Sequence, residues 1–138
     1  MKKQFVALIV LFFCSNATFS DDSATLEAVE RNARAWLELT DAGRYVESWS
    51  SASPQFKAQQ SEADWAKKIQ SIRTPRGTME ARYLAAAGYT QTPSGFVDGD
   101  YIMLQFYVTF SKSGLQRESV TLEKQIDETW RVAEYEIK

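Results

Sequence analysis

The second half of the sequence carries a carboxylate and several tyrosines whose types and spacing could perform acid–base chemistry. Glu80 and Tyr101 are the catalytic candidates, because a tyrosine can hydrogen-bond the oxyanion that develops when a nearby carboxylate removes a proton. The candidate ligand-binding residues are Tyr83, Gln105 and Tyr107 on the same predicted strands and Arg117 on the next one. The competing interpretation is packing across strands, the usual role of tyrosine at alternating strand positions. The pattern favours packing, and hence a protein without catalytic activity.

A cluster of cations could bind a partner. It contains Lys67, Lys68, Arg73, Arg76 and Arg82. Glu80 is the only acid within these sixteen residues, so their local net charge is +4. Such a cluster could dock an acidic protein, anionic lipid headgroups or a carboxylate-bearing ligand. The alternative is structural, because cations near the end of a predicted helix complement its negative C-terminal end.

The N-terminus has the pattern of a secretory signal peptide. Lys2 and Lys3 precede ten apolar residues, 5–14, and a short polar stretch follows. Cleavage is expected after Ser20, with Ala17 as the alternative. The apolar run is about half of the roughly 20 residues that a membrane-spanning helix needs, so no transmembrane anchor is expected after cleavage. We therefore expect a periplasmic or secreted protein.

The composition of residues 21–138 excludes several classes of chemistry. This segment contains no histidine and no cysteine, which removes the usual transition-metal ligands, the Cys-His nucleophile pair and the Ser-His-Asp triad. We predict neither a metal site nor another cofactor. Loss of the signal peptide takes away two lysines and no acid, leaving 14 basic and 18 acidic residues and a net charge of −4. This charge argues against nucleic-acid binding, which needs cations to neutralise phosphates.

The remaining sequence divides into a helical first half and a strand-rich second half. Apolar residues recur at helical spacing and then alternate with a period of two. The predicted helices cover 25–42, 44–51 and 61–72. Pro54 is expected to prevent the second helix from continuing. The predicted strands cover 79–85, 100–110, 115–124 and 130–137.

This order of elements predicts a single α+β domain at 21–138, with N-terminal helices packed on a curved antiparallel four-stranded sheet. Both faces of the strand at 100–110 are expected to be at least partly covered. A strongly bent sheet would enclose a cone-shaped pocket.

A series of short motifs resembles the family called domain of unknown function 4019. The motif residues are Asp41, Gly43, Tyr45, Ser48-Trp49, Phe56, Trp65, Pro75 with Gly77, Arg82, Asp98-Gly99-Asp100-Tyr101, Leu104-Gln105-Phe106 and Trp130-Arg131-Val132-Ala133. The resemblance covers nearly all of 21–138 and implies a small exported or envelope-associated bacterial protein without an established activity. The architecture is also similar to the nuclear-transport-factor-2-like (NTF2-like) or cystatin-like folds, which host enzymes and binding domains alike. From its position beside Gly43, Asp41 is expected to serve the turn.

The function these observations favour is a non-catalytic binding or interaction module of the envelope. Its partner would be an unknown protein or a small apolar ligand, held on the curved sheet or in a groove between helix and sheet. The alternative is a cofactor-free lyase or isomerase that uses acid–base chemistry in an NTF2-like pocket. A homodimer is a third possibility, because an aromatic-rich open sheet face suits a dimer surface.

Overall fold

The computed structural model describes residues 17–138, with side chains from residue 22 onward. The predicted signal peptide thus lies outside the described residues except for its last four, which begin the first helix. The helices are α1 (Ala17–Asp41), α2 (Tyr45–Ser51), α3 (Pro54–Gln59), α4 (Glu62–Arg73) and the short 3-10 turn η1 (Thr74–Arg76). The strands are β1 (Met79–Thr90), β2 (Tyr101–Phe110), β3 (Gly114–Lys124) and β4 (Trp130–Ile137). No helix in this part of the chain is both long and apolar enough to cross a membrane.

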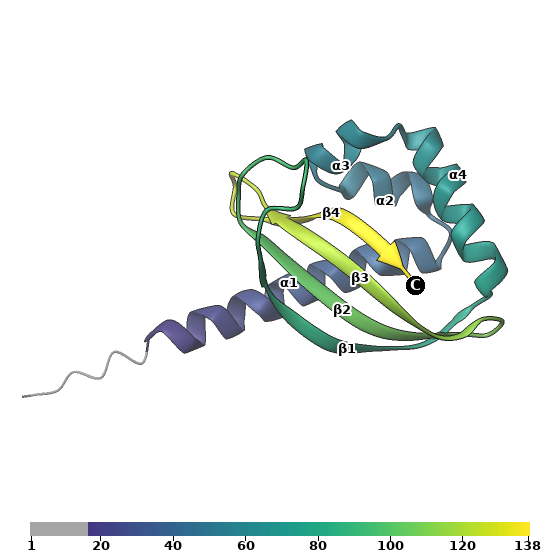
Figure 1. Ribbon diagram of the computed structural model, residues 1–138, viewed down its shortest axis with the longest axis horizontal. Helices are drawn as coiled ribbons and strands as arrows, with labels where there is room; N and C mark the ends of the chain where they lie inside the picture. The colour runs from purple at the N-terminus through teal and green to yellow at the C-terminus, as the bar shows by residue number, and fades with distance from the viewer. Residues whose placement is uncertain (1–16) are drawn as a thin grey trace, which may run out of the picture.

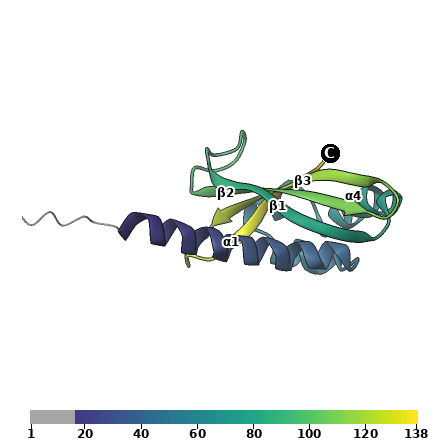
Figure 2. The same ribbon diagram turned by 90° about the horizontal axis from the view of Figure 1, so that it is seen from below.

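The four strands form an antiparallel sheet in the order β1-β2-β3-β4. The predicted α+β class, with N-terminal helices on a four-stranded antiparallel sheet, is therefore confirmed. Figure 1 shows the strands in front of α1, with α2, α3 and α4 gathered beyond β4. Figure 2 shows α1 lying beneath the sheet. We call the face that packs against the helices the inner face, and the opposite face the outer face.

Helix α1 begins at Ala17, eight residues before the predicted start at residue 25, whereas α2 and α4 begin and end within one residue of the predicted positions, and one helix is added. Pro54 was predicted to end the preceding helical segment. It is also the first residue of α3. The Ser53 side chain caps this helix by accepting a hydrogen bond from the backbone N–H of Phe56. Proline suits the first helical position, where its missing N–H would have no intrahelical partner. The turn after α1 uses Gly43, whose φ of 74° favours glycine.

The core lies between the inner face and the helices. Its strand residues come from alternate positions of β2 and β3, among them Leu104, Phe106 and Val120. The rings of Trp36, Phe56, Trp65 and Tyr135 pack together in this space, with neighbouring centroids 4.8–6.2 Å apart. These rings occupy the region where the sequence analysis expected a cone-shaped pocket. The sheet therefore supports a packed interior at that position.

The expectation that both faces of the 100–110 strand are at least partly covered is met on the outer face at Tyr101, Gln105 and Thr109, but not at Met103 and Tyr107. On β2, Ile102, Leu104 and Phe106 are buried on the inner face, whereas Met103 and Tyr107 are exposed on the outer face. Tyr101 differs because Phe96 of the 91–100 loop stacks on its ring at 6.1 Å. This loop rises beside the outer face at one end of the sheet (Figure 2). The rest of the outer face has no described element over it.

Candidate functional site

The strand register arranges the outer-face residues in three rows. Residues directly opposite each other in an antiparallel pair project from the same face. The cationic row contains Tyr83, Tyr107, Arg117 and Lys138. The central row contains Ala86, Gln105, Ser119 and Glu136. The acidic row contains Gly88, Met103, Thr121 and Glu134.

All four sequence-predicted ligand-binding residues lie on this face. Tyr83, Tyr107 and Arg117 are opposed across β1, β2 and β3, and Gln105 lies in the adjacent central row. The structure brings these residues together on an open sheet surface, and not inside a pocket. Exposed apolar surface is concentrated here, because Tyr83 is 67% exposed, Tyr107 is 50% exposed and Leu115 beside them is 68% exposed.

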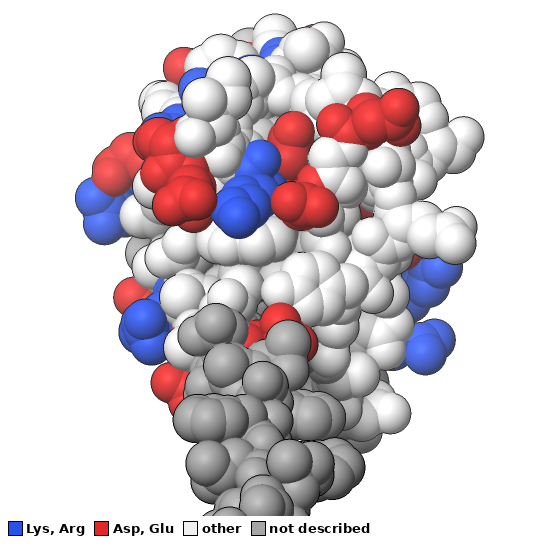
Figure 3. Space-filling model, turned by 90° about the vertical axis from the view of Figure 1, so that its left-hand side faces the viewer, with Lys and Arg blue, Asp and Glu red and all other residues white. Residues whose placement is uncertain are grey.

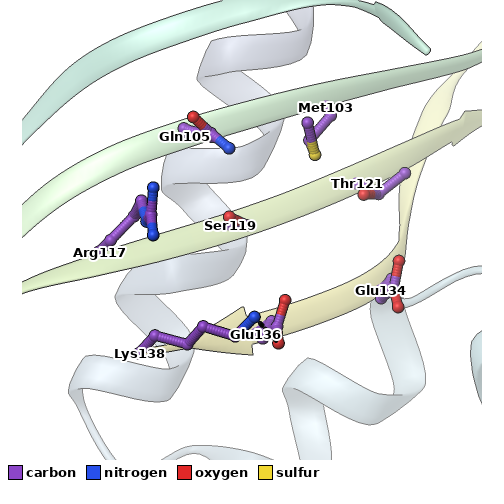
Figure 4. Close-up of a pocket in the computed structure, with 8 residues that line it drawn as sticks. All are labelled: Met103, Gln105, Arg117, Ser119, Thr121, Glu134, Glu136 and Lys138. Atoms are coloured by element: carbon purple, nitrogen blue, oxygen red, sulfur yellow. Dashed lines mark ion pairs between the residues drawn. The ribbon is translucent and has the colours of Figure 1, made fainter.

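A groove of about 260 Å³ lies on the outer face over β2, β3 and β4. Its lining residues come from all three rows: Met103, Gln105, Arg117, Ser119, Thr121, Glu134, Glu136 and Lys138. Figure 4 shows these side chains on β2, β3 and β4, with helices behind the sheet. The Lys138 ammonium forms an ion pair with the Glu136 carboxylate at 3.0 Å. Short side chains such as Ser119 form the floor, so the groove is a consequence of small residues between longer ones.

The two catalytic candidates do not form a site. Glu80 lies exposed near the start of β1, where Met79 pairs with Phe110. Tyr101 lies at the other end of the same strand pair, opposite Thr90. An acid–base pair must share one substrate within hydrogen-bond reach, and these two side chains are separated by nearly the whole length of β2. The structure therefore offers no support for this pair as an active site.

Tyr101 instead holds the 91–100 loop against α3. Its hydroxyl donates to the Val97 carbonyl at 2.7 Å and accepts from the Gln55 Nε2 at 2.6 Å. The Gln55 Oε1 accepts from the Val97 N–H at 2.7 Å, which closes a three-residue ring of hydrogen bonds. Burial raises the pKa of the Tyr101 phenol, and the hydrogen bond from Gln55 opposes this shift. The role of Tyr101 in the structure is thus to fix a loop.

The predicted cationic cluster is divided by the fold. Lys67 and Lys68 are exposed on α4, and no ion pair forms with either within residues 22–138. Arg76 is half-buried and donates to the Gln116 side chain and the Ile72 carbonyl. Arg73 and Arg82 are 5% exposed and paired with carboxylates. The prediction of one partner-binding surface made of all five cations is therefore wrong, because Arg73 and Arg82 are buried in ion pairs.

These two arginines belong to a buried polar network that connects helices to the sheet. The Arg82 guanidinium donates to both carboxylate oxygens of Asp41, at 2.7 and 2.9 Å, and to the Glu118 Oε1 at 2.7 Å. Arg73 donates to the Asp41 Oδ1 at 2.6 Å and stacks on the Phe110 ring at 4.9 Å. The Tyr135 hydroxyl donates to the Glu118 Oε2 at 2.7 Å. Asp41 therefore does more than serve the turn, because it joins the end of α1 to α4 and β1.

In the network, burial and ion pairing shift the pKa values of Asp41 and Arg82 in opposite directions. Burial alone would raise the pKa of the Asp41 carboxyl, but the hydrogen bonds and charges of Arg82 and Arg73 hold it below its ordinary value. Burial would lower the pKa of Arg82, and Asp41 and Glu118 together raise it instead. Burial and the Glu118 charge raise the pKa of the Tyr135 phenol. Asp41 and Arg82 therefore keep their charges, which suits a structural network.

The Asp41 carboxylate is expected to make stability depend on pH in the acidic range. Because its folded pKa lies below its unfolded value of about 4, its stabilisation is fully present above that value and is lost as pH falls through the folded pKa. Replacing Asp41 with asparagine should therefore cost more at pH 7 than at pH 3. Urea unfolding of both proteins at the two pH values tests this. An equal difference at both would contradict it.

Several residues of the buried polar network and of the outer face were not identified from the sequence. Glu118 and Tyr135 complete the network, and Glu118 is fully buried although it is a carboxylate. A signal for Glu118 was present, because it is in phase with Val120 and Leu122 along β3. The outer-face residues Ser119, Thr121 and Glu134 were missed because polar residues on an exposed strand face carry no distinctive pattern.

The end of the molecule opposite α4 has a different charge from the predicted cationic cluster. Figure 3 views this end and shows acidic side chains gathered around the centre of its upper half, with fewer basic ones between them.

No group of three or more His, Cys, Asp or Glu side chains within the described part of the chain could hold a metal ion.

Comparison with known proteins places the chain in a family. Residues 32–135 match the family described as Protein of unknown function (DUF4019). The chain belongs to this family. Several motif residues of this DUF4019 protein have structural roles: Asp41 and Arg82 belong to the buried network, and Phe56 and Trp65 belong to the aromatic core. Gln105, in contrast, lies on the outer face and lines the groove.

A solved structure from Catenulispora acidiphila shares the fold of the DUF4019 protein. The likeness has a TM-score of 0.55 at 11% sequence identity, and it covers 86% of this chain and 94% of that chain. At this identity the likeness shows a common fold. No curated protein matches the chain.

Proposed function

We propose that this DUF4019 protein is a non-catalytic interaction module that docks another protein surface on the outer face of its sheet, after export to the envelope. One observation carries the proposal: the outer face has no described helix over it, yet it presents Tyr83, Tyr107 and Leu115 to solvent. Contiguous exposed apolar side chains beside polar ones are typical of interaction surfaces.

A protein surface fits this face better than a small apolar ligand does. The centre of the space between the inner face and the helices is occupied by aromatic rings such as Trp36 and Trp65. A groove of about 430 Å³ remains between α1 and β4, and its lining includes the charged residue Arg131. The groove on the outer face has charged residues such as Arg117 and Glu134 in its lining. A small apolar molecule would leave these groups without compensating hydrogen bonds. A broad partner that supplies its own polar groups would satisfy them.

Site-specific photocrosslinking in cells tests the docking face. A photoreactive phenylalanine derivative would replace Tyr107 on the outer face and, in a matched control, Val46 on α2; both residues are 50% exposed. We expect an adduct of one reproducible mass from position 107 and none from position 46. A second change on the same face, Tyr83→Ala, should reduce the adduct from position 107. Equal labelling at both positions, or no adduct from the outer face, would overturn the proposal.

A further inference from the structure

The pattern of the outer face is complementary to itself. The cationic and acidic rows lie on either side of the central row, and each crosses the same four strands. A half turn about an axis along the central row exchanges the other two rows while each strand keeps its own position. A surface that pairs with a copy of itself about a two-fold axis must have this property.

We propose that the outer face binds the outer face of a second copy of the chain, about a two-fold axis along the central row. The inference rests on the proposed function, because it names the partner of that same face. Each strand then lies over its own counterpart, with Gln105 and Ser119 close to the axis. The cationic row of each copy covers the acidic row of the other.

The shapes of the exchanged residues are complementary. Tyr83, the most exposed tyrosine of the outer face, lies over Gly88 of the partner subunit. Gly88 leaves open space there, because no atom lies within 4 Å of where its Cβ would be. On the neighbouring strand, Tyr107 lies over the partner's Met103, and a flexible thioether beside an aromatic ring is a favourable contact. Large side chains thus meet small or adaptable ones.

Opposite charges meet on either side of the axis in the same arrangement, whereas Glu136 in the central row faces its own copy and is neutralised by Lys138 of its own chain. Lys138 lies over Glu134 of the partner subunit, and the symmetry makes this contact twice. Within residues 22–138 no cation lies within ion-pair distance of Glu134. Lys138 is 68% exposed in its pair with Glu136, so its ammonium can reach a second carboxylate. Such pairs at the rim contribute mainly to orientation and to the choice of partner.

The area of the face sets the expected strength of the dimer. Strands of eight to twelve residues, spaced about 4.8 Å apart with a rise of about 3.4 Å per residue, give a face of about 500 Å² per copy. The two copies together bury about 1,000 Å², which is below the range of about 1,200–2,000 Å² for stable interfaces and typical of weak, transient ones. We therefore expect a concentration-dependent dimer with a Kd on the order of micromolar.

Sedimentation equilibrium of the purified protein over a range of concentrations measures this Kd. The decisive variant is Gly88→Trp, because the new side chain points into open space in the monomer and meets Tyr83 in the dimer. We expect the Kd to rise at least about tenfold, which corresponds to about 1.4 kcal/mol. Ala58→Trp places the same side chain on exposed α3 and should leave the Kd unchanged. Circular dichroism confirms that each variant is folded.

A charge exchange between two variants separates this arrangement from any other dimer. Glu134→Lys and Lys138→Glu each place like charges opposite one another and should each weaken self-association roughly tenfold. An equimolar mixture of the two variants restores opposite charges at both contacts. We expect the mixture to dimerise with a Kd close to that of the unmodified protein. Failure of the mixture to dimerise would overturn the proposed arrangement.

The outcomes distinguish this inference from the proposed function. A protein that stays monomeric at all concentrations, or a dimer insensitive to Gly88→Trp, overturns the second copy as partner. If crosslinking from position 107 then captures a protein of another mass, the docking function stands and the inference is wrong. If that position captures nothing and the protein is monomeric, both are wrong.

Discussion

Replacing Arg82 with methionine is expected to lower the free energy of unfolding by about 3–5 kcal/mol. The guanidinium donates to the carboxylates of Asp41 and Glu118, and the three side chains are 5%, 15% and 0% exposed, respectively. Methionine has a similar length and adds apolar packing, but it leaves Glu118 without a cation. A buried charge without its partner is strongly destabilising, whatever the net contribution of the intact pair. Urea unfolding monitored by tryptophan fluorescence measures the change.

Two further variants make this prediction specific to the network. Lys67→Met removes an exposed cation of the same predicted cluster and should change stability by less than about 0.5 kcal/mol. The double variant Arg82→Met with Glu118→Leu removes the unpaired carboxylate, and we expect it to recover part of the lost stability. A loss below about 1 kcal/mol for Arg82→Met alone would show that the ion pairs are not formed as described.

Replacing Trp65 with alanine is expected to cost about 3–5 kcal/mol, the usual range for a fully buried tryptophan. The Trp65 ring packs edge-on against Phe56 at 4.8 Å and lies 6.2 Å from the Tyr135 ring. Its indole Nε1 also donates to the Ser48 Oγ at 2.9 Å. Alanine would leave a cavity where α4, α3 and β4 meet. Thermal and urea unfolding report the loss.

A conservative change separates packing from hydrogen bonding at this position. Trp65→Phe keeps an aromatic ring but removes the indole N–H, so Ser48 loses its donor. The hydrogen-bond component should be about 1–2 kcal/mol, smaller than the loss for alanine. Trp49→Ala is a comparison at a half-buried ring, and its cost should also be smaller. Equal costs for Trp65→Ala and Trp49→Ala would contradict the central place of Trp65.

The alternation of apolar residues was sufficient to predict the sheet. In β2 the inner-face side chains from Ile102 to Phe110 are uniformly apolar, so strand and buried face followed directly from the sequence. Helix α3 was missed because Pro54 can end one segment or begin the next. The deciding feature is the Ser53 cap, which depends on the backbone conformation at that residue.

The buried network and the outer face could be predicted only in part. Strand parity placed Glu118 on the apolar side of its strand, but it placed Arg82 on the face opposite the apolar one, and the contact between them depends on pairing across β2. Asp41 is 41 residues from Arg82, and no local pattern shows that the end of α1 reaches β1. The outer-face residues were assigned to a ligand pocket because periodicity defines two faces without showing which one the helices cover.

The position of β4 determines when during synthesis the fold can close. The Val132 carbonyl accepts from the Ser53 N–H at 2.8 Å, and the Trp130 carbonyl accepts from Asn32, which is 98 residues earlier in the chain. Tyr135 completes both the aromatic core and the ion-pair network. A strand that is made after α1–α4 and β1–β3 thus supplies the contacts that hold the first helices. A chain in which β4 has not yet been made has no complete core and cannot complete its fold. This property suits a chain proposed to cross a membrane before it folds.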